Sequence, residues 1–317
     1  MKRKQLRWLS SFLLCLLGFP PLSMSQESVS SIREFSESAP SVRETPEPSP
    51  PADDARIGSE TEDLTASPIP ERPYGFHQIG LDAKYLVTRP AHLDRNGILK
   101  LAMTFGTAGV LYVYREEIRD WVQSHRDPQR DEFLDSARVM GKGATAPALA
   151  LIAYGSSFIT KNPREKETSV LLLESVGFSS VAVGIEQWVL ASERPREGTD
   201  TDLFGRRGHG ASGDAMLAAS IVPILSRQYL TPGAEDGGGE RFGKLSAASL
   251  LYAGAFLTGY QRMNTDAHWA PDVFLGLVTG FSIGQMLCDS HEASRAETAR
   301  RFHFSTGPGT FQATLRF

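Results

Sequence analysis

An arginine, a histidine and an aspartate in the last quarter of the chain have the types and the spacing of a nucleophilic site. Arg262, His268 and Asp272 stand in the stretch GYQRMNTDAHWAPDVFLGLVTG, just before an apolar segment of helical length. Pro271 favours the first turn of a helix, because the N–H that proline lacks would be unpaired there. We therefore expect a helix to begin at Ala270 or Pro271, with His268 just outside it and Asp272 in its first turn.

This expected geometry suits attack by an imidazole on phosphorus. The positive end of a helix favours an ionised carboxylate at Asp272, and such a carboxylate beside a ring N–H fixes the tautomer and orientation of His268. The other ring nitrogen is then free to attack, while the planar guanidinium group of Arg262 can bind phosphate oxygens. The alternative is that Asp272 only caps the helix and that His268 is a surface histidine.

The same stretch resembles a known motif. The order Arg262, five residues, His268, three residues, Asp272, followed by Val-x-x-Gly, is similar to the third motif of the type 2 phosphatidic acid phosphatase (PAP2) and vanadium haloperoxidase superfamily. The resemblance implies an all-α fold in which His268 forms a phosphohistidine, Asp272 orients it and Arg262 holds phosphate oxygens.

An upstream segment resembles the first motif of this superfamily, which is a lysine, six residues and Arg-Pro. Gln187 occupies the lysine position, and Arg194 and Pro195 follow at the matching distance. In the superfamily both side chains bind the phosphate, so Gln187 removes one positive charge from the pocket while it keeps a hydrogen-bond donor. The alternative for Arg194-Pro195 is a helix end followed by a loop, since proline disfavours helical geometry in the residue before it.

The stretch HGASGDAM, which lies between these two segments, resembles the second motif, Pro-Ser-Gly-His. Ser212 and Gly213 match, whereas Asp214 stands in place of the histidine. Ser212 is a good N-cap, and the free N–H groups of the helix that follows it would form an anion site. The resemblance therefore implies that Ser212 and Gly213 hold phosphate oxygens; the alternative is a plain serine-capped helix.

Whether the site is active depends on Asp214, which replaces the histidine of the second motif. In the superfamily the histidine at this position is the general acid that protonates the leaving group. An ionised aspartate would repel phosphate, but a bound phosphate favours the protonated form of a nearby carboxyl group, which makes Asp214 a candidate acid. His209, in the same loop, is a second candidate. A degenerate pocket that binds an anion without turnover is the alternative.

The N-terminal residues 1–25 have the basic start, the short apolar run and the small residues of an export signal, with an uncleaved anchor as the alternative. Cleavage would remove four basic residues and no acidic one, which changes the formal net charge from −4 to −8. An acidic chain does not favour nucleic-acid binding.

Residues 26–72 are rich in Ser, Pro and Glu, so we expect them to be disordered. After cleavage Cys288 is the remaining cysteine, which excludes an intrachain disulfide and a cysteine-based metal site.

Residues 73–290 contain apolar segments of helical length, which predict an all-α bundle of about six core helices. The segments are about 97–123, 135–160, 167–191, 212–230, 242–261 and 271–288. Residues 74–93 show no clear helical or strand periodicity of apolar residues. Each segment is marginally long for a membrane span, and Glu174 and Glu186 lie inside the third, so a soluble bundle and a membrane-associated one both stay open. In the tail, 291–317, two alternating runs around Gly-Pro-Gly predict a β-hairpin.

These observations predict an exported phosphatase of the cell envelope that hydrolyses a phosphomonoester or pyrophosphate, lipid phosphates included, and that needs no metal or other cofactor. One alternative is a catalytically degenerate anion-binding protein, for which Gln187 and Asp214 argue. The other is a vanadate-dependent haloperoxidase with His268 bound to vanadium, a case that Gln187 weakens.

Overall fold

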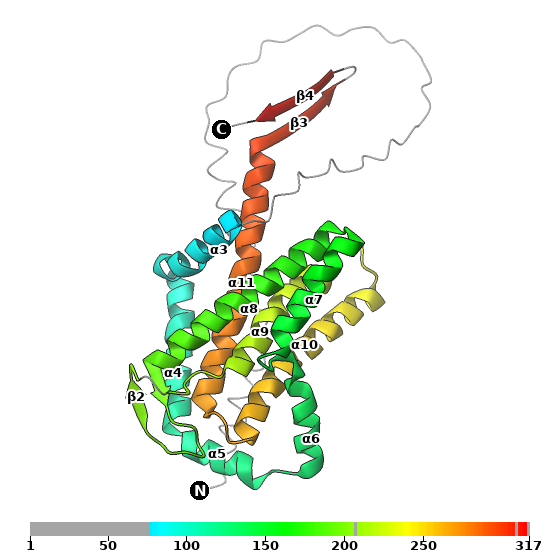
Figure 1. The fold of residues 1–317 in the computed structure, drawn as a ribbon. Helices are drawn as coiled ribbons and strands as arrows, with labels where there is room; N and C mark the ends of the chain where they lie inside the picture. Colours follow the sequence, from blue (N-terminus) through cyan, green and yellow to red (C-terminus); the bar gives the residue numbers. More distant parts are fainter. Residues whose placement is uncertain (1–75, 206–207, 308–309, 316–317) are drawn as a thin grey trace. The chain divides into compact units, whose positions relative to one another are not determined.

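The computed structural model describes residues 76–205, 208–307 and 310–315, and all of them lie in one compact unit, Ala66–Phe317. The predicted export signal (1–25) and the predicted disordered segment (26–72) both fall outside the described residues. The described elements are, in order, α3 (Phe76–Thr88), the 3₁₀ turn η1 (Arg89–His92), α4 (Arg95–Val113), α5 (Arg115–Ser124), α6 (Pro128–Ala137), the 3₁₀ turn η2 (Arg138–Met140), α7 (Thr145–Thr160), α8 (Pro163–Val189), β1 (Leu190–Ser192), β2 (Thr201–Leu203), α9 (Gly213–Tyr229), α10 (Gly238–Asn264), α11 (Ala270–Arg301), β3 (Phe302–Gly307) and β4 (Thr310–Leu315) (Figure 1).

The structure confirms the all-α class and the C-terminal hairpin, in which β3 pairs with β4 in antiparallel register. Helices α8, α9, α10 and α11 follow the predicted segments. The first two predicted segments are each broken: the chain bends by 65° between α4 and α5, and by 44° between Pro128–Met140 and Thr145–Thr160. Between the first and second predicted segments, the carboxylate of Asp127 accepts hydrogen bonds from Gln129 N and Arg130 N and so starts α6 ahead of Pro128.

Two expectations about helix limits are wrong. Residues 74–93, which show no clear period, contain the helix α3, and its buried face carries the polar residues Gln78 and Asp82. A hydrophobic period cannot reveal a helix that buries polar side chains. Helix α11 continues to Arg301 and does not end near Cys288; just beyond Cys288 it contacts α3 through the hydrogen bond from Ser290 Oγ to Asp82 Oδ1 (2.6 Å).

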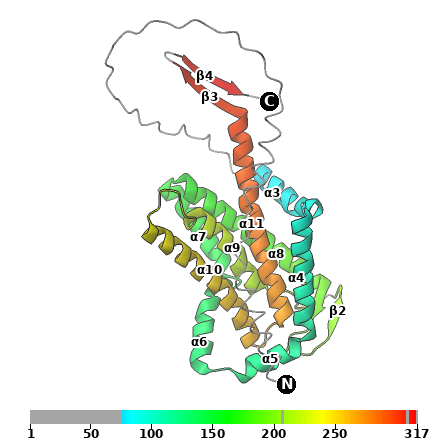
Figure 2. The same cartoon turned by 180° about the vertical axis from the view of Figure 1, so that it is seen from behind.

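Helices α9 and α11 lie side by side and parallel, and glycine allows their close approach (Figures 1 and 2). A Cβ atom at Gly276 would lie 2.7 Å from the carbonyl oxygen of Ser212, and one at Gly284 would clash with the carbonyl of Ser220; Gly280, between them, faces the same helix. Because the contacts advance in the same direction along both helices, their N-termini lie at the same end. This packing brings the second and third predicted motifs together.

The surface of the helices is apolar over large areas. Helices α8 (Pro163–Val189) and α11 (over Ala270–Ala296) are long and apolar enough to cross a membrane, and the two bent pairs raise the number to four if each is one span. Large apolar side chains are exposed on α4, α7 and α10, among them Ile98, Leu99, Phe105, Val113, Leu151, Ile152, Phe158, Ile159, Phe242 and Leu250. Soluble monomers rarely expose such surface, so these features indicate membrane association.

Candidate functional site

The three predicted motif segments meet at the shared N-terminal end of α9 and α11. Direct hydrogen bonds connect each segment to the others. They run from Gln187 Nε2 to the carbonyl of Ala211 (3.2 Å), from Trp269 Nε1 to the carbonyl of Glu193 (2.8 Å), from Ser212 N to the carbonyl of Asp272 (3.0 Å) and from His209 N to the carbonyl of Ser192 (2.8 Å). Residues far apart in the sequence are therefore held in one place, as the prediction of a single site requires.

His268 is a buried, neutral imidazole in this site. Its Nδ1 atom lies 3.2 Å from the carbonyl oxygen of Gly210, and because a carbonyl only accepts, Nδ1 carries the proton and Nε2 keeps its lone pair. Burial, followed by the positive charge of Arg262, lowers the pKa of His268 from 6.5 to about 3; the charge of Arg194 acts in the same direction. The imidazole therefore has the protonation state of a nucleophile at neutral pH.

The structure assigns the contact that orients His268 to Gly210 and not, as the sequence predicted, to Asp272. The Oδ2 atom of Asp272 instead accepts hydrogen bonds from Trp269 N (3.3 Å) and Ser192 Oγ (3.2 Å). A carboxylate in the first turn of a helix folds back readily onto free N–H groups, which is the capping alternative noted from the sequence. Asp272 thus positions the loop that carries His268 and ties it to β1.

Arg194 and Arg262 supply positive charge with free hydrogen-bonding capacity. The Nε–H groups of both arginines are buried and have no hydrogen-bond partner among the described residues. Each buried donor without a partner lowers the stability of the fold by about 1–3 kcal/mol, so such donors are rare in native structures and commonly mark a ligand site. Arg194 Nη1 lies 3.8 Å from Glu197 Oε1, which is a long ion pair. The other N–H groups of this guanidinium remain available for an anion. Two such guanidinium groups around a neutral imidazole suit an oxyanion.

Asp214 is held by two arginines. Its Oδ2 atom lies 2.7 Å from Arg138 Nε and 3.5 Å from Arg262 Nε. A carboxylate that accepts a charge-assisted hydrogen bond has no proton to give, so this geometry does not favour Asp214 as the general acid. Arg138, in η2, is a site residue that sequence reasoning missed; it belongs to no motif, and no local pattern marks its pairing with a residue so far along the chain.

The remaining predicted residues have separate positions in the site. Ser212 is fully buried, and its Oγ atom accepts a hydrogen bond from Ala215 N (3.4 Å), which confirms it as an N-cap. Gly213 follows it in the first turn of α9. The amide of Gln187 is used to hold the second-motif loop, so it contributes to the shape of the site. His209 is 37% exposed and lies 3.9 Å from Glu197 Oε2, on the solvent side of the loop that ends at Gly210.

Helices α5 and α6 hold the turn that precedes His268, a contribution that the sequence did not reveal. Arg119 donates two hydrogen bonds of 2.6 Å to the carboxylate of Asp266, which has a left-handed backbone (φ 58°). Gln123 Nε2 donates to the carbonyl of Asn264 (3.2 Å), and Asn264 Nδ2 donates to Asp131 Oδ1 (2.6 Å). These contacts keep the residues between α10 and α11 in one conformation.

The low pKa of His268 predicts an acid-sensitive contribution to stability. In the unfolded chain the imidazole takes up a proton below pH about 6.5, whereas in the folded chain it stays neutral down to about pH 3. The unfolded state therefore binds more protons in this window, and the free energy of unfolding falls as the pH drops. We expect the Tm of the unchanged chain to fall more between pH 7.5 and 4.5 than that of His268→Asn. Replacement of the exposed His125 in the same way should leave the pH dependence unchanged, and equal slopes in all three chains would contradict the buried neutral state.

The position of Asp214 predicts that it weakens anion binding. Asp214→Asn should lower the inhibition constant for orthovanadate or inorganic phosphate about tenfold, because one negative charge leaves the neighbourhood of Arg138 and Arg262. Asp236→Asn is the matched control, since Asp236 also pairs with a cation, Lys244, but lies outside the site. Unchanged or weaker inhibition in Asp214→Asn would contradict this electrostatic effect.

Comparison with known proteins gives a similarity of fold. No family model matches the chain, and no curated protein does. Among solved structures, the chain is similar to LpxE of Aquifex aeolicus, with 20% identity and a TM-score of 0.39 over 55% of this chain and 94% of that one. It is also similar to a transmembrane PAP2-type phosphatidylglycerolphosphate phosphatase of Bacillus subtilis, with 16% identity and a TM-score of 0.43 over 69% of this chain and 98% of that one. The identity and TM-scores are low, so the case for a function rests on the site.

Proposed function

We propose that the chain is a membrane-associated phosphatase that hydrolyses a lipid phosphomonoester or pyrophosphate through a phosphohistidine. One observation carries the proposal: the neutral imidazole of His268 lies within electrostatic range of Arg194 and Arg262, whose buried Nε–H groups have no hydrogen-bond partner among the described residues. Each guanidinium group has a carboxylate nearby, but its buried Nε–H group still needs a hydrogen-bond acceptor. A phosphate group accepts several hydrogen bonds from guanidinium forks and brings the compensating negative charge.

Phosphate binding uses the arginines together with a helix end. The Nε–H groups of Arg194 and Arg262 donate to phosphate oxygens. The first N–H groups of α9, at Gly213 and Asp214, have no partner within their own helix and point toward the same end as the positive pole of the helix dipole. Helix α11 adds a second positive pole there because it runs parallel to α9.

The chemical steps follow from the protonation state of His268. Nε2 attacks phosphorus in line with the leaving group, the P–O bond to that group breaks, and a phosphohistidine forms. Nδ1–H keeps its hydrogen bond to Gly210 and stabilises the positive charge that develops on the ring. Water then attacks phosphorus, releases inorganic phosphate and restores the imidazole. This scheme uses no metal ion or other cofactor.

The leaving oxygen needs a proton, and His209 is the better placed of the two predicted acids. Asp214 is paired with Arg138, whereas His209 is partly exposed and lies in the loop that contacts His268. Its charge lowers the pKa of His268, which places it within electrostatic range of the nucleophile. His209 in its protonated form donates to the departing alkoxide and then accepts a proton from the attacking water.

A lipid phosphate is the substrate class that fits the rest of the chain. Exposed apolar side chains on α4, α7 and α10 would contact acyl chains, and a phosphate head group would reach the polar end of the bundle where the site lies. The export signal predicted for residues 1–25 would place the protein in the cell envelope.

The test is phosphate release by the purified full-length chain in detergent micelles. Phosphatidic acid, an isoprenoid pyrophosphate and p-nitrophenyl phosphate should each be assayed with a chelator present, beside the His268→Ala chain. We expect release from at least one lipid, faster than from p-nitrophenyl phosphate, and a phosphoenzyme that is labile in acid and stable in base. Equal rates in the two chains on every substrate would remove the claim of catalysis.

A binding protein without turnover is the second candidate, and Gln187 together with Asp214 favours it. In that case calorimetry would detect binding of orthovanadate or phosphate that Arg262→Ala abolishes, while no substrate is hydrolysed. A haloperoxidase would reveal itself differently, by vanadate-dependent oxidation of bromide with hydrogen peroxide.

A further inference from the structure

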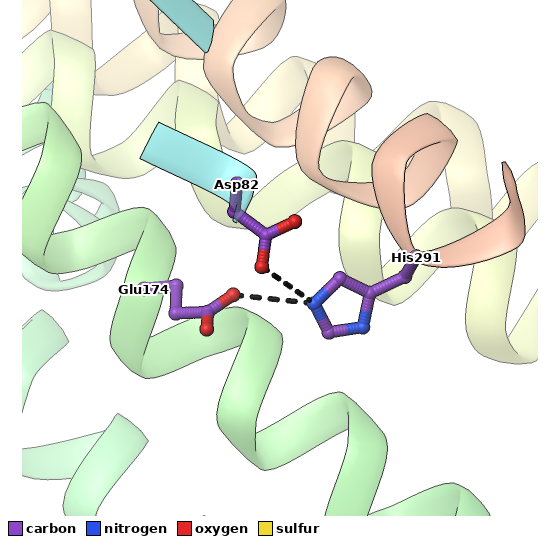
Figure 3. Close-up of side chains that lie close together, drawn as sticks. All are labelled: Asp82, Glu174 and His291. Atoms are coloured by element: carbon purple, nitrogen blue, oxygen red, sulfur yellow. Dashed lines mark hydrogen bonds and ion pairs between the residues drawn. The ribbon is translucent and has the colours of Figure 1, made fainter. Parts of the chain in front are cut away.

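A second polar cluster is buried between α3, α8 and α11, away from the candidate phosphate site. Asp82, Glu174 and His291 come from these three helices, and all are at least nine-tenths buried (Figure 3). His291 follows Asp272 along α11 by a distance of roughly 28 Å at 1.5 Å per residue, so the two sites are separate. The proposed phosphatase steps make no use of this cluster.

The distances within the cluster are longer than those of charge-assisted hydrogen bonds. His291 Nε2 lies 3.3 Å from Asp82 Oδ2 and 3.3 Å from Glu174 Oε2, and Figure 3 shows both carboxylates directed at this one nitrogen. An ion pair with a single N–H would hold one oxygen at about 2.7–2.9 Å. Ligand atoms of a tetrahedral metal site with bonds of about 2.0–2.2 Å lie about 3.4 Å apart, close to the two distances from His291, and all three ligand atoms lie within 4.8 Å of one another.

One buried oxygen in the cluster lacks a partner. Glu174 Oε1 has no hydrogen-bond partner among the described residues, although the side chain of Glu174 is only 5% exposed. An unpaired carboxylate oxygen at this depth is costly, and a cation is the usual solution. This oxygen belongs to the carboxylate that already faces His291, so a cation held there would compensate its charge.

The groups around the cluster form the outer contacts typical of a metal centre. Glu167 Oε1 lies 3.6 Å from His291 Nδ1 and is itself held by Arg295 Nη1 at 2.6 Å. Gln78 Nε2 (3.1 Å) and Ser290 Oγ (2.6 Å) donate to the carboxylate of Asp82. A carboxylate behind a histidine ligand fixes its tautomer, with Nδ1 protonated and Nε2 as the nitrogen that binds the metal.

We propose that Asp82, Glu174 and His291 bind a divalent transition-metal ion, with Zn²⁺ as the best match, and that the ion locks α3 onto α8 and α11. A nitrogen ligand with two carboxylates suits Zn²⁺ better than Mg²⁺ or Ca²⁺, which prefer oxygen alone. The charge also balances: the carboxylates of Asp82, Glu174 and Glu167, the guanidinium of Arg295 and a dication add to zero around a neutral imidazole.

The experiment measures Zn²⁺ binding to the purified full-length chain after removal of metal by a chelator, through competition with a chromophoric Zn²⁺ indicator. We expect one tight Zn²⁺ per chain and a higher Tm when it is bound. His291→Asn and Glu174→Gln should each weaken binding at least about 100-fold, and Glu167→Gln, an outer contact, about 10–100-fold. Circular dichroism would verify that each variant keeps its helix content.

Two matched controls keep the test specific. Glu186→Gln replaces another carboxylate of α8, one that accepts a hydrogen bond from Thr279 Oγ1 (2.6 Å), and His125→Asn replaces an exposed histidine; both should bind Zn²⁺ like the unchanged chain. The proposal is overturned if the unchanged chain binds no more Zn²⁺ than His291→Asn, or if Glu186→Gln lowers binding as much as Glu174→Gln.

Discussion

His268→Ala should lower the rate of phosphate release at least about 10³-fold, since it removes the proposed nucleophile. The loss should appear in kcat and in kcat/KM alike. It should also remove the phosphoenzyme that is trapped with radiolabelled substrate, a readout that a merely positioning residue would only reduce. The measurement is release of inorganic phosphate from phosphatidic acid in detergent micelles at pH 7.

The control for this variant is His125→Ala. His125 is exposed and contacts only its own helix end, where Nδ1 lies 2.7 Å from the carbonyl of Trp121, so its replacement should leave the rate unchanged. If His268→Ala keeps more than about a tenth of the activity while its Tm and helix content are normal, the covalent mechanism fails. A water molecule activated by another base would then be the nucleophile.

Arg262→Ala should lower kcat/KM about 10²–10³-fold, the usual effect of removing one donor that stabilises transition-state charge. Arg262 lies in the last turn of α10 with its Nε–H buried and unpartnered, so the loss removes both a charge and a directed hydrogen bond. Arg262→Lys should recover part of the activity, because lysine keeps the charge but not the planar fork. The readouts are steady-state kinetics and inhibition by orthovanadate, which should weaken in parallel.

A double variant separates phosphate binding by Arg262 from its effect on Asp214. If Arg262 serves mainly to neutralise that carboxylate, 3.5 Å away, then Arg262→Ala combined with Asp214→Asn should regain most of the activity. If Arg262 binds the phosphate, the double variant should stay as inactive as the single one, which is the result we expect. Arg126→Ala, which removes an exposed arginine paired with Asp131, is the control for charge alone.

The elements of the fold were predictable because they depend on local patterns. Apolar segments of helical length predicted α8 to α11, the Gly-Pro-Gly stretch with its alternating flanks predicted the hairpin of β3 and β4, and Ser212 was recognisable as an N-cap from its type and position. The break between α4 and α5 at Tyr114 was missed, because no proline or glycine marks it and the charged run that begins at Arg115 is still compatible with a continuous helix. Helix α3 was missed because it buries Gln78 and Asp82.

Residue type and order along the chain were sufficient to select His268, Arg194 and Arg262 and to expect them around one anion. The partners of the site depended on contacts between distant segments. Only the tertiary structure shows that Gly210 holds the imidazole and that Arg138 holds Asp214. The physical reason is that spacing along a helix determines which side chains share a face, whereas the close parallel packing of α9 on α11 and the folding back of Asp272 onto the N–H of Trp269 depend on the whole bundle. The cluster at His291 is the extreme case, since each of its three polar residues lies on a different helix and carries no local signal.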